Sequence, residues 1–184
     1  MATALNAFMQ IGGAAGETKQ APYDGSDGKP PWIEIQAWDW EVEADTSWTK
    51  GGGAAVGKPS PGKMNWEHSF DKASNTILNY ICTGKSFDKI ELQMCKSTGD
   101  KGRTPFWTAV MTEAFITKVN QSATDEGNVL QKVEMVFKTI EIQYWQQGVD
   151  PKFPGRLDNV GTFKWNIPAG EAEPDKDGTD KLKA

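Results

Sequence analysis

The side chains in this chain that could do chemistry begin with His68, the only histidine. A histidine-rich metal site or a serine–histidine–aspartate relay needs several residues, so the metal site lacks its ligands and the relay would depend on His68 alone. Cys82 could act as a nucleophile with His68 as its base. His68 shares its parity with Trp66 and Phe70, however, where a hydrogen-bonded core histidine is favoured. We therefore expect no catalytic residue, no metal and no cofactor.

The glycine-rich segment GGGAAVGKPSPGK comes close to a phosphate-binding P-loop. Gly52, Gly57 and Lys58 have the required spacing, but Pro59 stands where the motif needs a hydroxyl for magnesium. Pro59 and Pro61 would also prevent the helix whose amino end holds the phosphates. The segment is better interpreted as an interaction loop than as a nucleotide site.

Carboxylates and tryptophans are the remaining candidates. Asp39, Glu41 and Glu43 alternate on one strand face, and Glu113 interrupts an apolar strand, but no pair stands out at the separation that a glycosidase needs. The eight tryptophans fit either a carbohydrate-binding platform on a β-sandwich or a core with a protein–protein interface. Five of them lie in alternating strand patterns, which favours core and interface: Trp38, Trp40, Trp66, Trp145 and Trp165.

One short helix stands among the strands that would position these residues. Ser74 is a suitable N-cap, and Gly84 suits a left-handed C-terminal cap. Between them the apolar residues recur with the helical period at Ile77, Leu78, Ile81 and Cys82. This spacing predicts a helix over about 74–83, with the Cys82 thiol in its apolar stripe. Strands precede and follow it, with alternation at Met64, Trp66 and His68 and again at Ile90, Leu92 and Met94.

Two strand segments change their apolar parity midway. In WIEIQAWDWEV the apolar residues are odd up to Ile35 and even from Trp38, and VEMVFKTIEIQYW changes between Phe137 and Ile140. Such a change indicates a bulge, or a strand whose halves bury opposite faces. FWTAVMTEAFITKV is apolar on both parities, so we expect a curved barrel wall that is also covered from outside. With one helix available, another copy of the protein is expected to supply part of that cover.

The bulk composition fits one domain over residues 1–169 of the 184. Residues 43–62 are predicted to be a long loop without regular structure, and the charged segment 170–184 a disordered tail. The net charge of −5 argues against a nucleic-acid partner, which needs clustered lysine and arginine.

Targeting signals are absent from the amino-terminal sequence, and no apolar run approaches the ~20 residues that span a bilayer. We therefore expect a chain made and folded in the cytoplasm, without membrane insertion. In that reducing compartment Cys82 and Cys95 are expected to be free thiols.

Read in order, these segments resemble the haemolysin-coregulated protein (Hcp) family, the inner-tube subunits of bacterial type VI secretion systems. The resemblance runs from about Phe8 to Ile167, through FMQIGGAAGET, IEIQAWDWEV, GGGAAVGK, WEHSFDKASNTILNYICTGK, IELQMCK, TAVMTEAFITKV, VEMVFKTIEIQYW and GTFKWNI. Its most specific parts are the paired tryptophans, the helix closing with CTGK, and VxMxFKxIxIxY. The chain departs from the family in a longer connection at 148–159 and in the tail after Gly170.

The resemblance implies a mainly β fold, a split or closed β-barrel of long antiparallel strands with one short flanking α-helix. It implies six copies per ring, rings stacked into a hollow tube, and export on sheath contraction without a cleaved signal peptide. The implied partners are the sheath, baseplate and spike proteins, with small effector proteins as cargo in the lumen, and the protein would not be an enzyme. A tube protein of a phage-like contractile particle would share the fold and stays open as an alternative.

In the resemblance, the 43–62 loop corresponds to an extended loop that reaches toward the next ring. Trp48 is its only large aromatic side chain and could anchor the contact, with lysines meeting an acidic surface opposite. The expected ring-stacking residues are Trp48, Lys50, Gly51, Gly52, Gly53 and Lys58.

Overall fold

The structure is a computed structural model that describes residues 6–49, 52–97, 103–147 and 157–173. These residues form strands and one helix in the order β1 (Ala7–Ile11), β2 (Ile33–Asp39), β3 (Val42–Thr49), β4 (Gly52–Pro61), β5 (Met64–Ser69), α1 (Lys72–Thr83), β6 (Ser86–Ser97), β7 (Arg103–Ala123), β8 (Val129–Val136), β9 (Thr139–Gln147), β10 (Leu157–Asn166) and β11 (Glu171–Glu173). All strand pairings are antiparallel.

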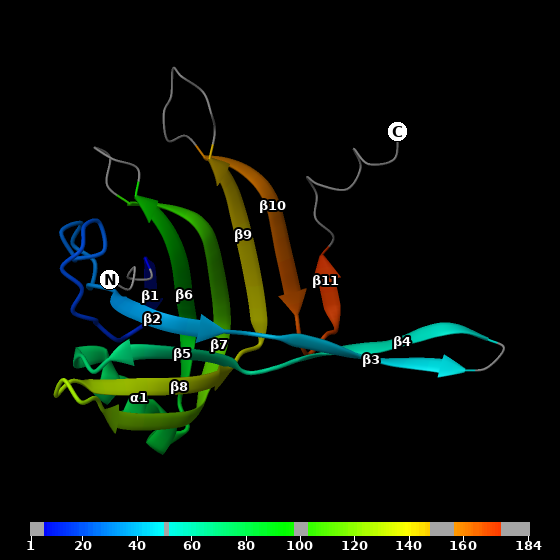
Figure 1. Ribbon diagram of the computed structural model, residues 1–184, viewed down its shortest axis with the longest axis horizontal. Coiled ribbons are helices and arrows are strands. Elements are labelled where there is room, and N and C mark those ends of the chain that lie inside the picture. The colour runs from blue at the N-terminus through cyan, green and yellow to red at the C-terminus, as the bar shows by residue number, and fades with distance from the viewer. Residues whose placement is uncertain (1–5, 50–51, 98–102, 148–156, 174–184) are drawn as a thin grey trace.

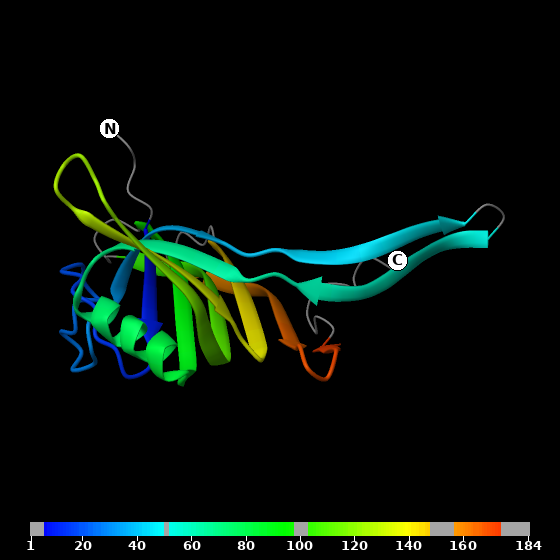
Figure 2. The same cartoon turned by 90° about the horizontal axis from the view of Figure 1, so that it is seen from below.

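Six strands close a barrel in the order β7-β6-β1-β2-β5-β8, because β8 bonds back to β7. We call β9, β10 and β11 the flange: they continue the sheet from β7, to one side of the barrel (Figure 1). The helix α1 packs along one side of the barrel, and its Tyr80 ring stacks on Phe87 of β6 with centroids 4.0 Å apart (Figure 2). The prediction of a closed β-barrel of long antiparallel strands with one flanking helix is confirmed.

The long strand β7 belongs to both the barrel and the flange. Its residues 107–112 pair with β9, and residues 115–123 pair with β8. Glu113 lies between them with φ +47°, a left-handed conformation that bends the strand. Its carboxylate accepts a hydrogen bond of 2.6 Å from Lys138 Nζ, which lies between β8 and β9. The change of the neighbouring strand from β9 to β8 along β7 explains why FWTAVMTEAFITKV is apolar on both parities.

The core fills the barrel with the inward residues of its strands, and it includes the long side chains of Met9, Ile35, Leu92, Met111 and Met135. The parity change in β2 is a bulge, as the sequence suggested: the register with β5 shifts between Ile35 and Ala37. The change in VEMVFKTIEIQYW has another cause, and the prediction of one strand is wrong. β8 ends at Val136 and β9 starts at Thr139, so the pattern belongs to two strands with different partners.

The helix starts earlier than predicted. Asp71 is its N-cap, because its Oδ1 accepts from the backbone N–H groups of Ala73 and Ser74 at 3.0 and 3.3 Å. The predicted N-cap Ser74 is therefore wrong: it is the third helical residue, and its Oγ accepts from the Asp71 N–H in a capping box. Gly84 has φ +65° and caps the carboxyl end as predicted.

Residues 43–62 are not a loop without regular structure, so that prediction is wrong. β3 and β4 form a separate two-stranded hairpin that projects away from the barrel (Figures 1 and 2). The register runs from Val42↔Pro61 to Thr49↔Gly52, with two bulges. The prolines of β4 are tolerated because β4 has a partner on one side only, so its other side needs no backbone donor.

The predicted tail also begins with structure. Glu171–Glu173 form β11 at the sheet edge, so the prediction that disorder starts at Gly170 is wrong for these residues. Residues 174–184 lie outside the described residues, and so does most of the 148–159 connection.

Candidate functional site

His68 is the centre of a buried hydrogen-bond chain. Its Nδ1 accepts from Trp66 Nε1 at 3.2 Å, since an indole N–H can only donate. Its Nε2 therefore carries the proton and donates to Ser74 Oγ at 3.1 Å. The side chain has no exposed surface. The prediction of a hydrogen-bonded core histidine is confirmed, and the chain ties β5 to the first turn of α1.

Burial lowers the pKa of His68 from 6.5 to about 4. The unfolded chain takes up a proton near pH 6.5, whereas folded His68 stays neutral until about pH 4, so the unfolded state binds more protons between these values. This contribution to stability is complete above the unfolded pKa and is lost as the pH falls. We expect the free energy of unfolding to fall by roughly 3 kcal/mol between about pH 6.5 and pH 4.

Urea unfolding across this pH range measures the loss. Because His68 is the only histidine, proton uptake on unfolding near pH 6.5 can be assigned to it. A free energy of unfolding that stays constant from about pH 7 to pH 5 would contradict the expected coupling.

The other candidates for chemistry are not brought together. Cys82 is exposed, so its predicted place in the apolar stripe of the helix is wrong, and the two His68 ring nitrogens bond to Trp66 and Ser74 instead. Asp39 accepts a hydrogen bond of 2.7 Å from Asn65, and the segment of the near P-loop is strand β4. Within the described ranges, no three histidine, cysteine, aspartate or glutamate side chains are grouped to hold a metal ion.

The flange carries an apolar face that extends beyond the core. Ile140 and Ile142 of β9 lie opposite Trp165 and Phe163 of β10, so these side chains share a face, and Tyr144 follows on the same parity. At the base, Ile140 and Trp165 are buried in the barrel core. Farther out, Tyr144 is 43% exposed and Phe163 is 38% exposed. Large apolar side chains left together on a surface mark an interaction site.

The outer face of β2, β5, β7 and β8 is polar, in contrast to the apolar face of the flange. Polar or charged side chains line most of a shallow depression of about 640 Å³ there: Asp39, Asn65, Glu67, Lys118, Asn120, Ser122, Lys132 and Glu134. The charges are paired across strands, with Lys132 Nζ 2.8 Å from Glu67 and Lys118 Nζ 2.9 Å from Glu134. Hydrogen bonds from Lys118 and Lys63 lower the pKa of Glu134. This face is polar, and both of its lysines are paired with glutamates of the same chain.

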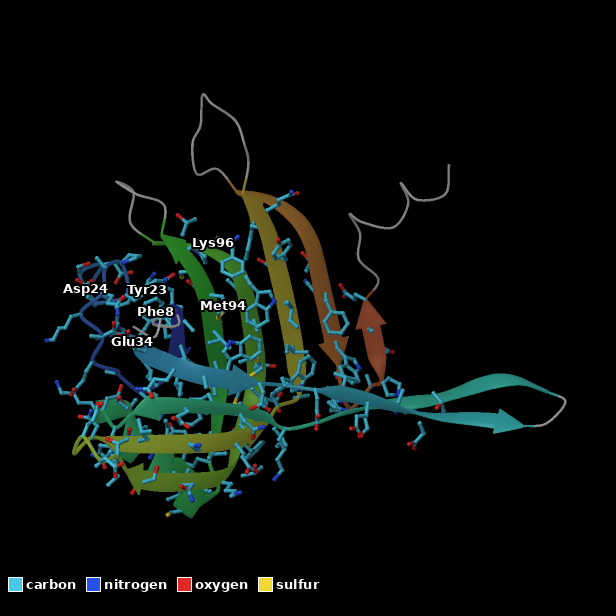
Figure 3. All side chains as sticks on the ribbon, in the orientation of Figure 1. Phe8, Tyr23, Asp24, Glu34, Met94 and Lys96 are labelled. Carbon is cyan, nitrogen blue, oxygen red and sulfur yellow. The ribbon has the colours of Figure 1, made fainter. Side chains whose placement is uncertain are left out.

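Sequence reasoning missed a second apolar cluster on the outside of the barrel. Residues 12–32 cover β1 there, and Phe8, Tyr23, Trp32 and Cys95 pack together. The Phe8 and Tyr23 rings stack with centroids 4.3 Å apart, and Tyr23 Oη lies 2.9 Å from Cys95 Sγ. Figure 3 labels Phe8 and Tyr23 close together beside β1. The available signal was the run Ala7-Phe8-Met9, which is apolar on both parities. Both cysteines are free thiols, as expected.

The predicted stacking residues lie on the hairpin as far as the structure describes them. Trp48 belongs to β3, Gly52 and Gly53 begin β4, and Lys50 and Gly51 lie outside the described residues. Lys58 is exposed, and its Nζ would be 3.1 Å from a Cβ placed on Gly170, at the turn between β10 and β11. Lys58 therefore lies close to Gly170, where a larger residue would crowd it.

Comparison with known proteins identifies what these surfaces belong to. The family model described as "Type VI secretion system effector, Hcp" matches residues 8–144. This chain belongs to the Hcp family. The family consists of structural tube proteins that the type VI system secretes, so the chain is a structural subunit of the type VI secretion tube. It works there with the other components of that machine.

Solved structures show the same fold. A structure described as a type six secretion system protein aligns at TM-score 0.77 and 20% identity, covering 92% of this chain and 100% of that chain. Hcp1 from Salmonella typhimurium aligns at TM-score 0.71 and 22% identity, over 93% of this chain and 100% of that one. A type VI secretion system effector from Yersinia pestis gives 0.64, with 20% identity and coverages of 88% and 99%. A comparison with curated proteins found no match.

Two sequence-based alternatives can now be weighed. The carbohydrate-binding β-sandwich is overturned by the barrel, and Trp66 and Trp165 are buried in its core. Trp38 and Trp40 pack against the same core, as predicted. In the part of the chain that the structure describes, no helix is long and apolar enough to cross a membrane.

Proposed function

We propose that six copies of this Hcp chain close into a ring and that the rings stack into the inner tube. The observation that carries the proposal is the uncovered apolar face of the flange, where Tyr144 and Phe163 stand exposed next to the core. A ring lets each copy cover the flange of its neighbour, because head-to-tail contacts satisfy every subunit equally once the rotation closes.

The polar face between β2 and β7 fits the wall of the lumen. Its charges are already paired within one chain, so it can stay hydrated without binding a passing protein tightly. In this arrangement the ring would admit small effector proteins, and its outer surface would meet the sheath. The baseplate and spike would meet the ends of the tube. The chain would perform no catalysis, because its only histidine is enclosed in the structural chain from Trp66 to Ser74.

Native mass spectrometry and negative-stain microscopy of the purified protein test the ring. We expect hexamers and ring-shaped particles without any added ligand. A protein that stays monomeric at all micromolar concentrations would overturn the proposal.

A shortened hairpin is expected to leave rings intact and to abolish stacking and secretion. Replacing residues 47–55 with Asn-Gly keeps the Thr46↔Val56 pair and supplies a two-residue turn. The barrel should survive, because β3 and β4 pair only with each other. Microscopy of ring and tube particles, with a secretion assay, measures the outcome.

A length-matched control separates reach from side-chain contacts. In that variant residues 47–55 become a glycine–serine segment of equal length, which removes Trp48, Lys50 and the Gly51–Gly53 run. If specific contacts hold the rings together, both variants fail to stack. If the shortened hairpin still forms full-length tubes, the hairpin is not a stacking element.

A further inference from the structure

Gln131 presents an unusual feature inside the barrel, next to the only histidine. It lies on β8 directly opposite His68 of β5 in the antiparallel register, so the two side chains share the inner face. Neither side chain has exposed surface. Among the described residues, the Gln131 amide nonetheless has no hydrogen-bond partner at Oε1 or Nε2. An unpaired buried amide is destabilising, and a leucine of similar size would avoid that cost.

The hydrogen bonds around His68 run in one direction. The Trp66 indole donates to Nδ1, and Nε2–H donates to Ser74 Oγ, which also accepts from the Asp71 N–H at 3.0 Å. A second proton on the ring can go only to Nδ1. It would then face the Trp66 N–H, and two donors would point at each other. Protonation therefore removes the Trp66 contact and leaves Nδ1–H in need of an acceptor.

We propose that His68 and Gln131 form an acid-operated switch inside the barrel. When His68 takes up a proton from the solvent at Nδ1, this nitrogen no longer accepts from the Trp66 indole. The new Nδ1–H donates to the Gln131 amide oxygen instead. The Gln131 amide is thus the acceptor for the protonated state, which explains why it is unpaired in the neutral one. Trp66 loses its hydrogen bond in the same step.

The described charged groups around His68 do not offer Nδ1 another acceptor in place of Gln131. On the α1 side, Asp71 Oδ1 lies 4.0 Å from Nε2, and burial raises the pKa of that carboxyl. On the β2 side the cross-strand neighbour is Ile35, which is apolar. On β5 and β8, Glu67 pairs with Lys132 at the outer depression rather than with the ring. Glu17 also raises the pKa of Asp71, and it forms an ion pair with Lys72 at 3.8 Å. Asp71 is thus the described carboxylate facing His68, and it faces the nitrogen opposite Nδ1.

Stability curves of Gln131→Leu test the switch. The variant is expected to unfold at an equal or higher urea concentration than the wild type at about pH 7.5, since it removes an unpaired amide. Near pH 4 and below, where the folded ring takes up its proton, the stability difference is expected to move against the variant, since the protonated ring has lost its acceptor. The two curves should therefore not run parallel. Gln121→Leu is the matched control, because Gln121 pairs with Gln131 from β7 but is exposed, and its curve should parallel the wild type.

Nuclear magnetic resonance measures the protonation of the His68 imidazole directly, because His68 is the only histidine in the chain. Gln131→Glu is expected to raise the imidazole pKa by about one unit or more, and Gln131→Leu to lower it. The Trp66 indole signal, assigned with Trp66→Phe, should shift together with the imidazole in the wild type. Parallel stability curves for Gln131→Leu, an imidazole pKa equal in all three proteins, or an indole signal that ignores the titration would each overturn the switch. None of these measurements depends on the assembly of subunits into rings.

Discussion

Glutamate in place of Phe163 is expected to convert the rings into monomers. Phe163 lies on the apolar face of the flange, which the proposed ring covers with a neighbouring copy. Each interface would then bury an unpaired carboxylate, at a cost of about 3 kcal/mol or more. That corresponds to roughly a hundredfold weaker contact at every interface of the ring. Native mass spectrometry at micromolar concentration measures the loss.

Phe70→Glu is the matched control for this variant. Phe70 is the same residue type and has the same exposed fraction of 38%, but it follows β5 at the barrel, away from the flange strands. Its variant should form rings like the wild type. Rings that survive Phe163→Glu, or that are lost equally in Phe70→Glu, would show that the flange face is not the ring contact.

Trp66→Ala is expected to give the largest loss of stability, about 3–5 kcal/mol in the free energy of unfolding. The side chain is 2% exposed in the barrel core, and its indole is the donor to His68 Nδ1. The substitution therefore leaves a cavity and a buried acceptor without its donor. Urea unfolding at about pH 7.5 measures the difference.

Trp66→Phe separates the two contributions. It keeps most of the ring volume and removes only the N–H, so we expect a loss of roughly 1–3 kcal/mol. If Trp66→Ala costs no more than Trp66→Phe, packing of the indole contributes little, contrary to its burial.

Local patterns predicted the parts of the fold that local physics determines. Alternation located β5 and β6, Gly84 located the end of α1, and the parity change in β2 located the bulge at Ile35 and Ala37. In each case the deciding interaction lies within a few residues or on one face of one strand. The family resemblance supplied the barrel closure, which no single pattern shows.

The larger misses depend on partners that are distant in the sequence, unlike the N-cap, which is decided by local contacts between Asp71 and Ser74. The β3–β4 hairpin was missed because glycine and proline have poor strand propensity, and its pairing is set by flanking strands that belong to the barrel. Cys95 is buried because residues 12–32 fold across it, which its own strand cannot reveal. The break after β8 mimics a bulge, because both give the same change of parity.

The assembly surfaces divide in the same way. The hairpin residues were proposed from the sequence because they are unusual in composition, whereas the flange face was hidden in ordinary alternation. Tyr144 and Phe163 look like core residues in the sequence, and only their exposure in the sheet beyond β7 shows that the described residues leave them partly uncovered. An exposed core pattern can be recognised only after the sheet order is known.

The strand β7 gives this subunit a mechanical property. The backbone of β7 is continuous from the part that pairs with β8 in the barrel to the part that pairs with β9 in the flange. A force applied at the flange contact of the ring is therefore transmitted to the barrel through covalent bonds. The hydrogen bonds to β6 lie along most of that strand, so they would share the force in shear. A tube that is pushed from its base would thus transmit compression from one subunit to the next. The hydrogen bond from Lys138 to Glu113 would stabilise β7 where it bends at Glu113.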